Sequence, residues 1–143
     1  MAGKVGILVL AVPVVAVAWA VSLFATGPPR DEELAASRAA FEQRTGVRVV
    51  RVALVAADGM VDLRYQVLDP DLAADLHDTP PLLIDEGTNE VIKELFMGHA
   101  HSGTPKAGPS YPIVFVNTGG LLERGSTVSI VIGEERLEHV VVQ

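Results

Sequence analysis

The residues best suited to chemistry in this chain are a methionine and two histidines near position 100. They stand at alternate positions, as Met97, His99 and His101. In an extended segment the side chains at i, i+2 and i+4 share one face, with about 6.6 Å between successive levels. Gly98 and Gly103 allow the backbone to curl, so the three donors can converge on one ion. The spacing therefore predicts a candidate metal site.

The donor set favours copper over harder metal ions. Two imidazoles and a thioether are soft to borderline ligands, which suit copper better than magnesium or calcium. Zinc suits this set less well because a carboxylate or a third histidine is lacking. Copper is therefore the one cofactor that residues 97–101 predict. The alternative is that these side chains are solvated loop residues, with Met97 a core contact at a strand end.

The Met/His set at residues 97–101 resembles that of small periplasmic β-sandwich copper chaperones. The resemblance covers these five residues alone, and the wider ligand spacing of those chaperones is not matched here. It implies copper binding or delivery by Met97, His99 and His101.

Three more residues offer sulfur or nitrogen donors elsewhere in the chain: Met60, His77 and His139. Each also has an ordinary structural explanation. Met60 follows an Asp-Gly turn, and His77 ends a short predicted helix. His139 shares a predicted strand face with Leu137 and Val141. We therefore do not count these residues among the predicted ligands.

No catalytic motif accompanies these residues. A serine–histidine–aspartate triad can be combined on paper, but no nucleophile elbow or other contextual motif supports it. Its members would be drawn from Ser102, Ser110, His99 and Asp85. The acid pair Asp85-Glu86 stands beside a predicted turn, where we expect a solvated hairpin end rather than a glycosidase-type pair. We therefore expect a protein that is not an enzyme.

The N-terminal segment is the second feature that bears on function. Residues 5–25 carry no charge, and Ser22 is their only polar side chain. As a helix they would extend roughly 31 Å, enough to cross a hydrocarbon core of about 30 Å. Pro13 is compatible with this because transmembrane helices tolerate bends better than soluble ones. We predict a transmembrane anchor over residues 1–26 that contacts the membrane through residues 5–25.

The alternative for this segment is a cleaved signal peptide, with Lys4 as a short basic region and residues 18–20 as the cleavage site. An uncleaved anchor is favoured because the apolar run continues past that site to full span length. Basic residues lie on both sides of the span, so their count does not decide its orientation. A very short N-terminal tail before an apolar run is the usual layout for export, so we expect the C-terminal domain to be periplasmic or extracellular.

The charge distribution argues against nucleic acid as a partner. Residues 27–143 hold eighteen acidic and ten basic side chains, a net charge of −8. Such a surface repels nucleic acid and anionic lipid headgroups. The chain has no cysteine, which excludes disulfides, thiolate metal sites and iron–sulfur clusters. Cations and basic partners are the ligands that suit this surface.

Residues 27–46 predict a linker and a short helix. Acidic residues from Asp31 onward suit a helix N-terminus, and Gly46 is placed to end the helix. Leu34 and Phe41 give only a thin apolar stripe. We therefore expect a spacer helix that rests on the domain after it.

Residues 47–143 predict a single antiparallel β-sandwich. The hydrophobic period changes to two, and turn signals such as Asp58-Gly59 separate short runs rich in β-branched residues. About seven strands are expected, over residues 47–57, 60–68, 80–86, 90–95, 111–117, 127–133 and 137–143. Their number and spacing are typical of two-sheet sandwiches of the immunoglobulin-like or cupredoxin-like class. The Cys–Trp–Cys framework of immunoglobulins is absent.

Two hypotheses about function follow. The first is a non-enzymatic, membrane-tethered extracytoplasmic domain that acts as an interaction or accessory subunit of an envelope protein complex. It rests on the anchor, the spacer helix, the sandwich and the lack of a catalytic motif. The second is a soft-metal protein that binds or delivers copper through Met97, His99 and His101.

Overall fold

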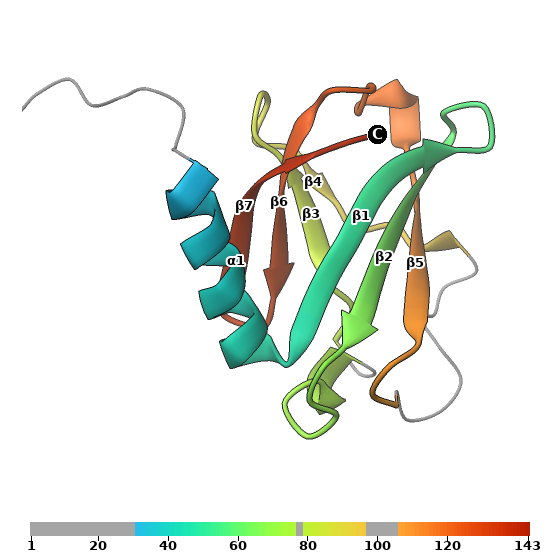
Figure 1. Ribbon diagram of the computed structural model, residues 1–143. Helices are drawn as coiled ribbons and strands as arrows, with labels where there is room; N and C mark the ends of the chain where they lie inside the picture. Colours follow the sequence, from blue (N-terminus) through green and yellow to red (C-terminus); the bar gives the residue numbers. More distant parts are fainter. Residues whose placement is uncertain (1–30, 77–78, 97–105) are drawn as a thin grey trace, which may run out of the picture.

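The computed structural model describes residues 31–76, 79–96 and 106–143, which form one α-helix and two antiparallel β-sheets (Figure 1). Each predicted strand is present among these residues, although the fourth is only two residues long. The elements are α1 (Asp31–Thr45), β1 (Val47–Val55), β2 (Met60–Val67), η1 (Ala74–Leu76), β3 (Leu82–Asp85), β4 (Val91–Ile92), β5 (Ser110–Val116), η3 (Thr118–Gly120), β6 (Thr127–Ile132) and β7 (Glu135–Val141).

The strands form one sheet of order β1-β2-β5 and another of order β4-β3-β6-β7. Every pair of neighbours is antiparallel. In the view of Figure 1 the three-stranded sheet lies in front of the four-stranded one. The chain is therefore mostly β, and its two sheets are consistent with the predicted sandwich.

The core lies between the two sheets and follows the period-two pattern of the sequence. The inward residues of β2 are Val61, Leu63, Tyr65 and Val67, each at most 2% exposed. They belong to one buried cluster with residues of the opposite sheet such as Ile130. Burying a large apolar side chain contributes roughly 1.5–3 kcal/mol, so this cluster is the main source of stability in a chain without disulfides.

Chain crossings join the two sheets along both sides. After β7, Val142 forms a bridge with Val52 of β1, and two main-chain hydrogen bonds of 2.9 Å link Gln143 to the same strand. After β4, the chain crosses to β5, where Leu95 bridges Phe115. These crossings cover β1 and β5, the two edge strands of the three-stranded sheet, which would otherwise invite pairing with other chains.

The predicted spacer helix is present and rests on the sheets. Figure 1 shows α1 beside β7 and β1, the two strands that it contacts. Phe41 anchors it with 1% exposure, whereas Leu34 is only partly buried. Gly46 ends the helix with φ +67°, and a Cβ at this position would lie 2.5 Å from the Asp69 carbonyl oxygen. Only glycine fits this turn.

The prediction that His139 shares a strand face with Leu137 and Val141 is wrong, because a β-bulge interrupts β7. The β6–β7 register shifts between Leu137 and Val140, so one extra residue stands on β7. His139 adopts a left-handed backbone with φ 60°. As a result Leu137 and Val140 are buried, whereas Val141 is 56% exposed.

The predicted transmembrane anchor over residues 1–26 lies outside the described residues. Within the described part of the chain, no helix is long and apolar enough to cross a membrane. The anchor therefore stays a prediction from the sequence.

Candidate functional site

The three predicted metal ligands also lie outside the described residues. They are Met97, His99 and His101. The chain approaches this segment from Leu95, which bridges β5. It returns at Lys106, whose N–H donates to the Tyr111 hydroxyl at 2.8 Å and whose carbonyl accepts from the same hydroxyl at 3.2 Å. Both described flanks of the segment are therefore fastened to β5.

The other donors do not assemble into a metal centre in the described part of the chain. Over residues 31–76, 79–96 and 106–143, no three His, Asp or Glu side chains are grouped to hold an ion. Met60 begins β2, and His139 is engaged through its Nδ1 atom, 3.0 Å from Glu86 Oε2. His77 lies outside the described residues.

Glu86 fastens the β7 bulge to the end of β3. Its Oε1 atom accepts hydrogen bonds from the His139 main-chain N–H at 2.7 Å and from the Ser129 hydroxyl at 2.9 Å. Burial raises the pKa of Glu86, but the hydrogen bonds from His139 and Ser129 together outweigh it and hold the pKa below its ordinary value. The carboxylate is thus ionised at neutral pH, and its partners give it a structural role.

Asp85 likewise serves the fold. It is 6% exposed, and its Oδ2 atom accepts from the Thr88 N–H at 3.1 Å and the Thr88 hydroxyl at 2.7 Å. The expectation of a solvated Asp85-Glu86 pair is therefore wrong, because both carboxylates accept hydrogen bonds within the domain. Ser110 begins β5 in the other sheet, and no hydrogen bond joins it to Asp85.

The outer surface of the three-stranded sheet carries a different set of side chains, which we call the arginine face. Its residues alternate with the core residues along β1, β2 and β5, so their side chains point away from the core. Three rows of directly paired residues make up the face: Arg51, Arg64 and Pro112; Ala53, Asp62 and Val114; and Val55, Met60 and Val116.

Asp62 is the buried centre of the arginine face. Its side chain is 6% exposed, whereas those of Arg51 and Arg64 are 41% and 42% exposed. Arg51 Nη2 donates to Asp62 Oδ2 at 3.1 Å, and Arg64 Nε donates to the same oxygen at 2.9 Å. Asp62 Oδ1 is buried without a hydrogen-bond partner among the described residues. An unpaired buried acceptor costs about 1–3 kcal/mol, so the described chain leaves this network incomplete.

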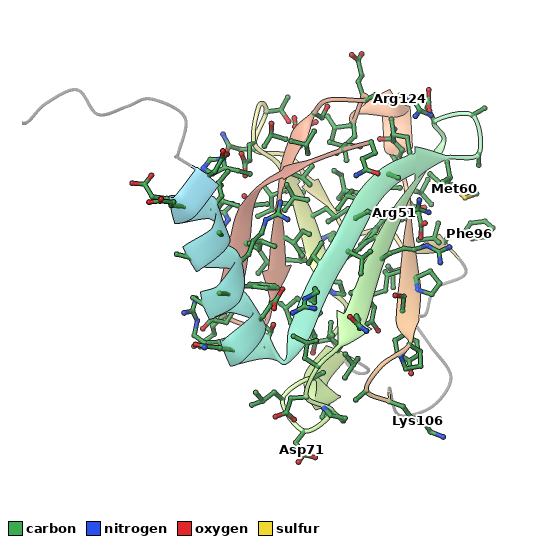
Figure 2. All side chains as sticks on the ribbon, viewed as in Figure 1. Arg51, Met60, Asp71, Phe96, Lys106 and Arg124 are labelled. Carbon is green, nitrogen blue, oxygen red and sulfur yellow. The ribbon has the colours of Figure 1, made fainter. Side chains whose placement is uncertain are left out.

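The surroundings of this network are apolar and partly exposed. Met60, Val114 and Val116 are each partly exposed, and Phe96, which follows the Leu95 bridge to β5, is 45% exposed. Figure 2 shows Met60 and Phe96 at the same margin of the sheet, with Arg51 nearer its middle. Aromatic residues, methionine and arginine are enriched in the cores of protein interfaces. The arginine face thus has the composition of a contact surface.

The arginine face also differs in charge from the rest of the molecule. Two guanidinium groups share one carboxylate, which gives the network a net charge of +1 in a chain of net charge −7. Arginine carries five N–H donors, and Arg51 and Arg64 each give one of them to Asp62. Among the described residues no other hydrogen bond engages these half-exposed side chains, so their remaining donors can reach an acidic ligand.

The arginine face was not predicted from the sequence. Asp62 and Arg64 alternate with apolar residues in β2, a pattern that is typical of a solvated strand face. The pairing of Arg51 with Arg64 depends on a register shift between Val49 and Arg51, which the hydrophobic period does not reveal. The available signal was the opposite charges at positions 62 and 64, beside an arginine in the preceding strand.

No protein-family model matches this chain, and no curated protein or solved structure is significantly similar to it. Among the described residues, the arginine face offers the most developed arrangement for binding.

Proposed function

We propose that this protein is a non-enzymatic, membrane-tethered interaction subunit of an envelope protein complex. Residues 5–25 would hold it in the membrane, and its β-domain would stand outside the cytoplasm. The observation that carries the proposal is the arginine face, where two half-exposed arginines hold a buried carboxylate amid apolar side chains.

The chemistry of this face defines the partner surface. A carboxylate of the partner would accept hydrogen bonds from the outer N–H groups of Arg51 and Arg64, and such charge-assisted pairs are strong and directional. A hydrogen-bond donor on the partner would pair with the Oδ1 atom of Asp62, which has no partner among the described residues. Phe96 and Met60 would pack on apolar atoms nearby, as aromatic and arginine hot spots do. The partner would thus expose an acidic side chain beside an apolar patch.

The charge pattern supports a specific orientation of this contact. The arginine network is positive in a chain that is strongly acidic overall. An acidic partner is therefore attracted at the arginine face and repelled from the rest of the domain, and such contrast fixes the register of a complex.

An immunoglobulin-like or cupredoxin-like sandwich remains part of this proposal. The sheets of three and four antiparallel strands support it. Such folds present side chains on open sheet faces but host many functions, so the arginine face and not the fold carries the argument.

The test compares two charge reversals in the full-length tagged chain, extracted in mild detergent from its native membrane. Arg64→Glu reverses a charge in the arginine face, and Arg136→Glu, on β7, is the matched control at 45% exposure. We expect the parent and the control to retain a co-purifying membrane protein and Arg64→Glu to lose about tenfold or more of it. A parent chain that purifies alone, or equal retention by both variants, contradicts the proposal.

The orientation of the β-domain relative to the membrane is tested separately, because docking in the envelope requires this domain to lie outside the cytoplasm. A reporter enzyme that is active only outside the cytoplasm is fused after Gln143 through a flexible linker. We expect it to be active, and activity of a cytoplasm-specific reporter instead would overturn the localisation.

Copper binding is the second candidate function. What supports it is the Met97-x-His99-x-His101 spacing, together with the attachment of both described flanks of this segment to β5.

We expect the full-length chain to bind one copper ion and the double variant His99→Ala, His101→Ala to lose it. The matched control removes the other two imidazoles, His77→Ala with His139→Ala. Equal copper affinity in parent and first variant excludes this site. Affinity should also fall at low pH, since coordinating imidazoles must be neutral.

A further inference from the structure

A groove lies between the segment that contains β4 and the segment that begins at the end of β5. Residues 90–94 form one wall, and Val116, Thr118 and Leu121 form the other. The two walls meet where the Val116 N–H donates to the Glu94 carbonyl at 2.8 Å. The groove holds about 430 Å³, within the range of roughly 300–1,000 Å³ that is usual for binding clefts.

Among the described residues no strand pairs with the outer edge of β4, which forms one wall of this groove, because β4 ends its sheet. The Asp85 N–H donates to the Glu90 carbonyl at 2.9 Å, so these two residues form a hydrogen-bonded pair. Such pairs alternate with non-bonded pairs in an antiparallel ladder. The next pair, Ile84 with Val91, is therefore non-bonded, and Val91 directs its N–H and C=O away from β3. The Val91 side chain is 49% exposed, so a ligand can reach this edge.

The charge of the groove is predominantly negative. Glu90 and Glu94 are both exposed along the β4 wall, and Lys93 is the one basic residue among the described residues that line the groove. The Thr118 hydroxyl donates to Glu94 Oε2 at 3.1 Å, which holds that carboxylate between the two walls. The net charge of the chain is negative as well, so its long-range field also favours a basic ligand.

We propose that this groove binds an extended, basic segment of a partner protein, which adds to β4 as a further strand. Hydrogen bonds to the main chain of Val91 would supply affinity, and alternate lysine or arginine side chains would face Glu90 and Glu94. Apolar side chains on the other face of the segment would lie beside Val91, whose side chain is 49% exposed. The groove shares Val116 with the arginine face, but the inference does not depend on docking there, because it uses neither Arg51 nor Arg64.

The test uses the full-length chain in detergent and fluorescent capped peptides, with binding followed by anisotropy. The basic probe is TKVTVKVT, which places both lysines on one face of a strand, and the acidic probe is TEVTVEVT. A third probe has the basic sequence with N-methyl groups on alternate residues, which keeps its charge but removes edge donors. We expect the basic probe to bind about tenfold tighter than either of the others. Equal binding by the acidic or the N-methylated probe overturns the proposal.

Variants of the groove residues provide a second test of the proposal. Val91→Pro removes the outward N–H at a position where proline spares the β3–β4 pairing, so we expect about tenfold weaker binding. Glu90→Gln with Glu94→Gln should weaken binding and reduce its salt dependence, whereas Glu123→Gln with Glu138→Gln, exposed elsewhere, should not. Full binding by Val91→Pro contradicts strand addition. If a thermal melt shows that this variant is unfolded, binding of the N-methylated probe to the parent chain still tests strand addition.

Two further measurements distinguish the proposed groove from a dimer contact and from the arginine face. A dimer of the parent chain that light scattering shows to be lost in Val91→Pro would assign the groove to a second copy of this chain and overturn the proposal. Arg64→Glu should bind the basic probe as the parent does, so the failure of the arginine face and the failure of the groove are distinguishable.

Discussion

Asp62 is the residue on which the arginine face depends. Its charge attracts Arg51 and Arg64 to one oxygen, while the other oxygen stays unpaired among the described residues. A buried carboxylate is seldom a good source of stability, because its desolvation offsets most of the attraction. A hydrogen-bond donor from a partner, as we propose for the arginine face, would complete the hydrogen bonding of Asp62.

Removing the charge of Asp62 should destabilise the isolated chain only moderately. Asp62→Asn keeps the shape of the side chain but weakens the hydrogen bonds that both arginines donate. We expect the free energy of unfolding to fall by about 1–3 kcal/mol, toward the lower end because the arginines are half-exposed. The control Asp58→Asn, whose side chain is 58% exposed, should stay within about 0.5 kcal/mol in the same urea titration. An unchanged or higher stability of Asp62→Asn contradicts this account.

Glu86 gives the stability of the domain a dependence on acid pH. Burial raises the pKa of this carboxyl group, whereas hydrogen bonds from His139 and Ser129 lower it. The net result is a pKa in the folded protein below the ordinary value of about 4.3. A lowered folded pKa means that the contribution is present above the unfolded pKa and is lost as pH falls through the folded pKa. We expect the parent to lose more stability than Glu86→Gln between about pH 5 and pH 3. Parallel curves for the two proteins in denaturant titrations would show that Glu86 does not contribute.

Asn117 joins separate elements at one end of the sandwich. It is 5% exposed, and its Nδ2 atom donates to the Asp58 carbonyl at 2.8 Å and to the Leu122 carbonyl at 2.9 Å. Its Oδ1 atom accepts from the Leu122 N–H at 3.0 Å. The β1–β2 turn and the segment after β5 are thus held by one amide.

Asn117→Asp keeps the shape of this side chain and removes both of its donors. We expect it to lower the free energy of unfolding by about 2–4 kcal/mol, because the buried Leu122 carbonyl and the Asp58 carbonyl lose their partners beside a new negative charge. Asn89→Asp is the control, since Asn89 is exposed and aspartate tolerates its left-handed backbone of φ 62°. Similar melting temperatures for the two variants would exclude this role of Asn117.

The strands were predictable from the sequence where the period of two is uninterrupted, and less so elsewhere. In β2 the alternation predicted every inward residue correctly, because residues 61–67 contain no β-bulge. In β7 the bulge beside His139 places Val141 on the exposed face, and the bulge is hydrogen-bonded to the carboxylate of residue 86, which is distant in sequence. Periodicity describes a single strand and does not report contacts between strands.

The arginine face was missed for a related reason. Its chemistry depends on Arg51 lying opposite Arg64, and that register follows from a shift in β1. The metal ligands were proposed from local spacing, which needs no register, and they lie in the part of the chain that is not described. Local motifs can be read directly from a sequence, whereas a site formed across strands requires the pairing to be known.

At the scale of the whole molecule, the last two residues close one side of the sandwich. Val142 is 1% exposed, and Gln143 shares two main-chain hydrogen bonds with β1. Deleting residues 142–143 should therefore lower the free energy of unfolding by about 3–5 kcal/mol, from the lost burial and hydrogen bonds. Gln143→Ala keeps the main chain and should have almost no effect in the same urea titration. A deletion variant as stable as Gln143→Ala would show that this crossing does not hold the sheets together.

The central claim is that the arginine face contacts an acidic protein surface in the envelope, and site-specific photo-crosslinking in intact cells tests it most directly. A photoreactive amino acid replaces Val114 in the middle row of the face, and Arg136 on the opposite sheet serves as the control position. The account predicts one discrete protein adduct from position 114, none from position 136, and loss of the adduct when Arg64→Glu is added. No adduct at position 114, or the same adduct from both positions, would contradict it.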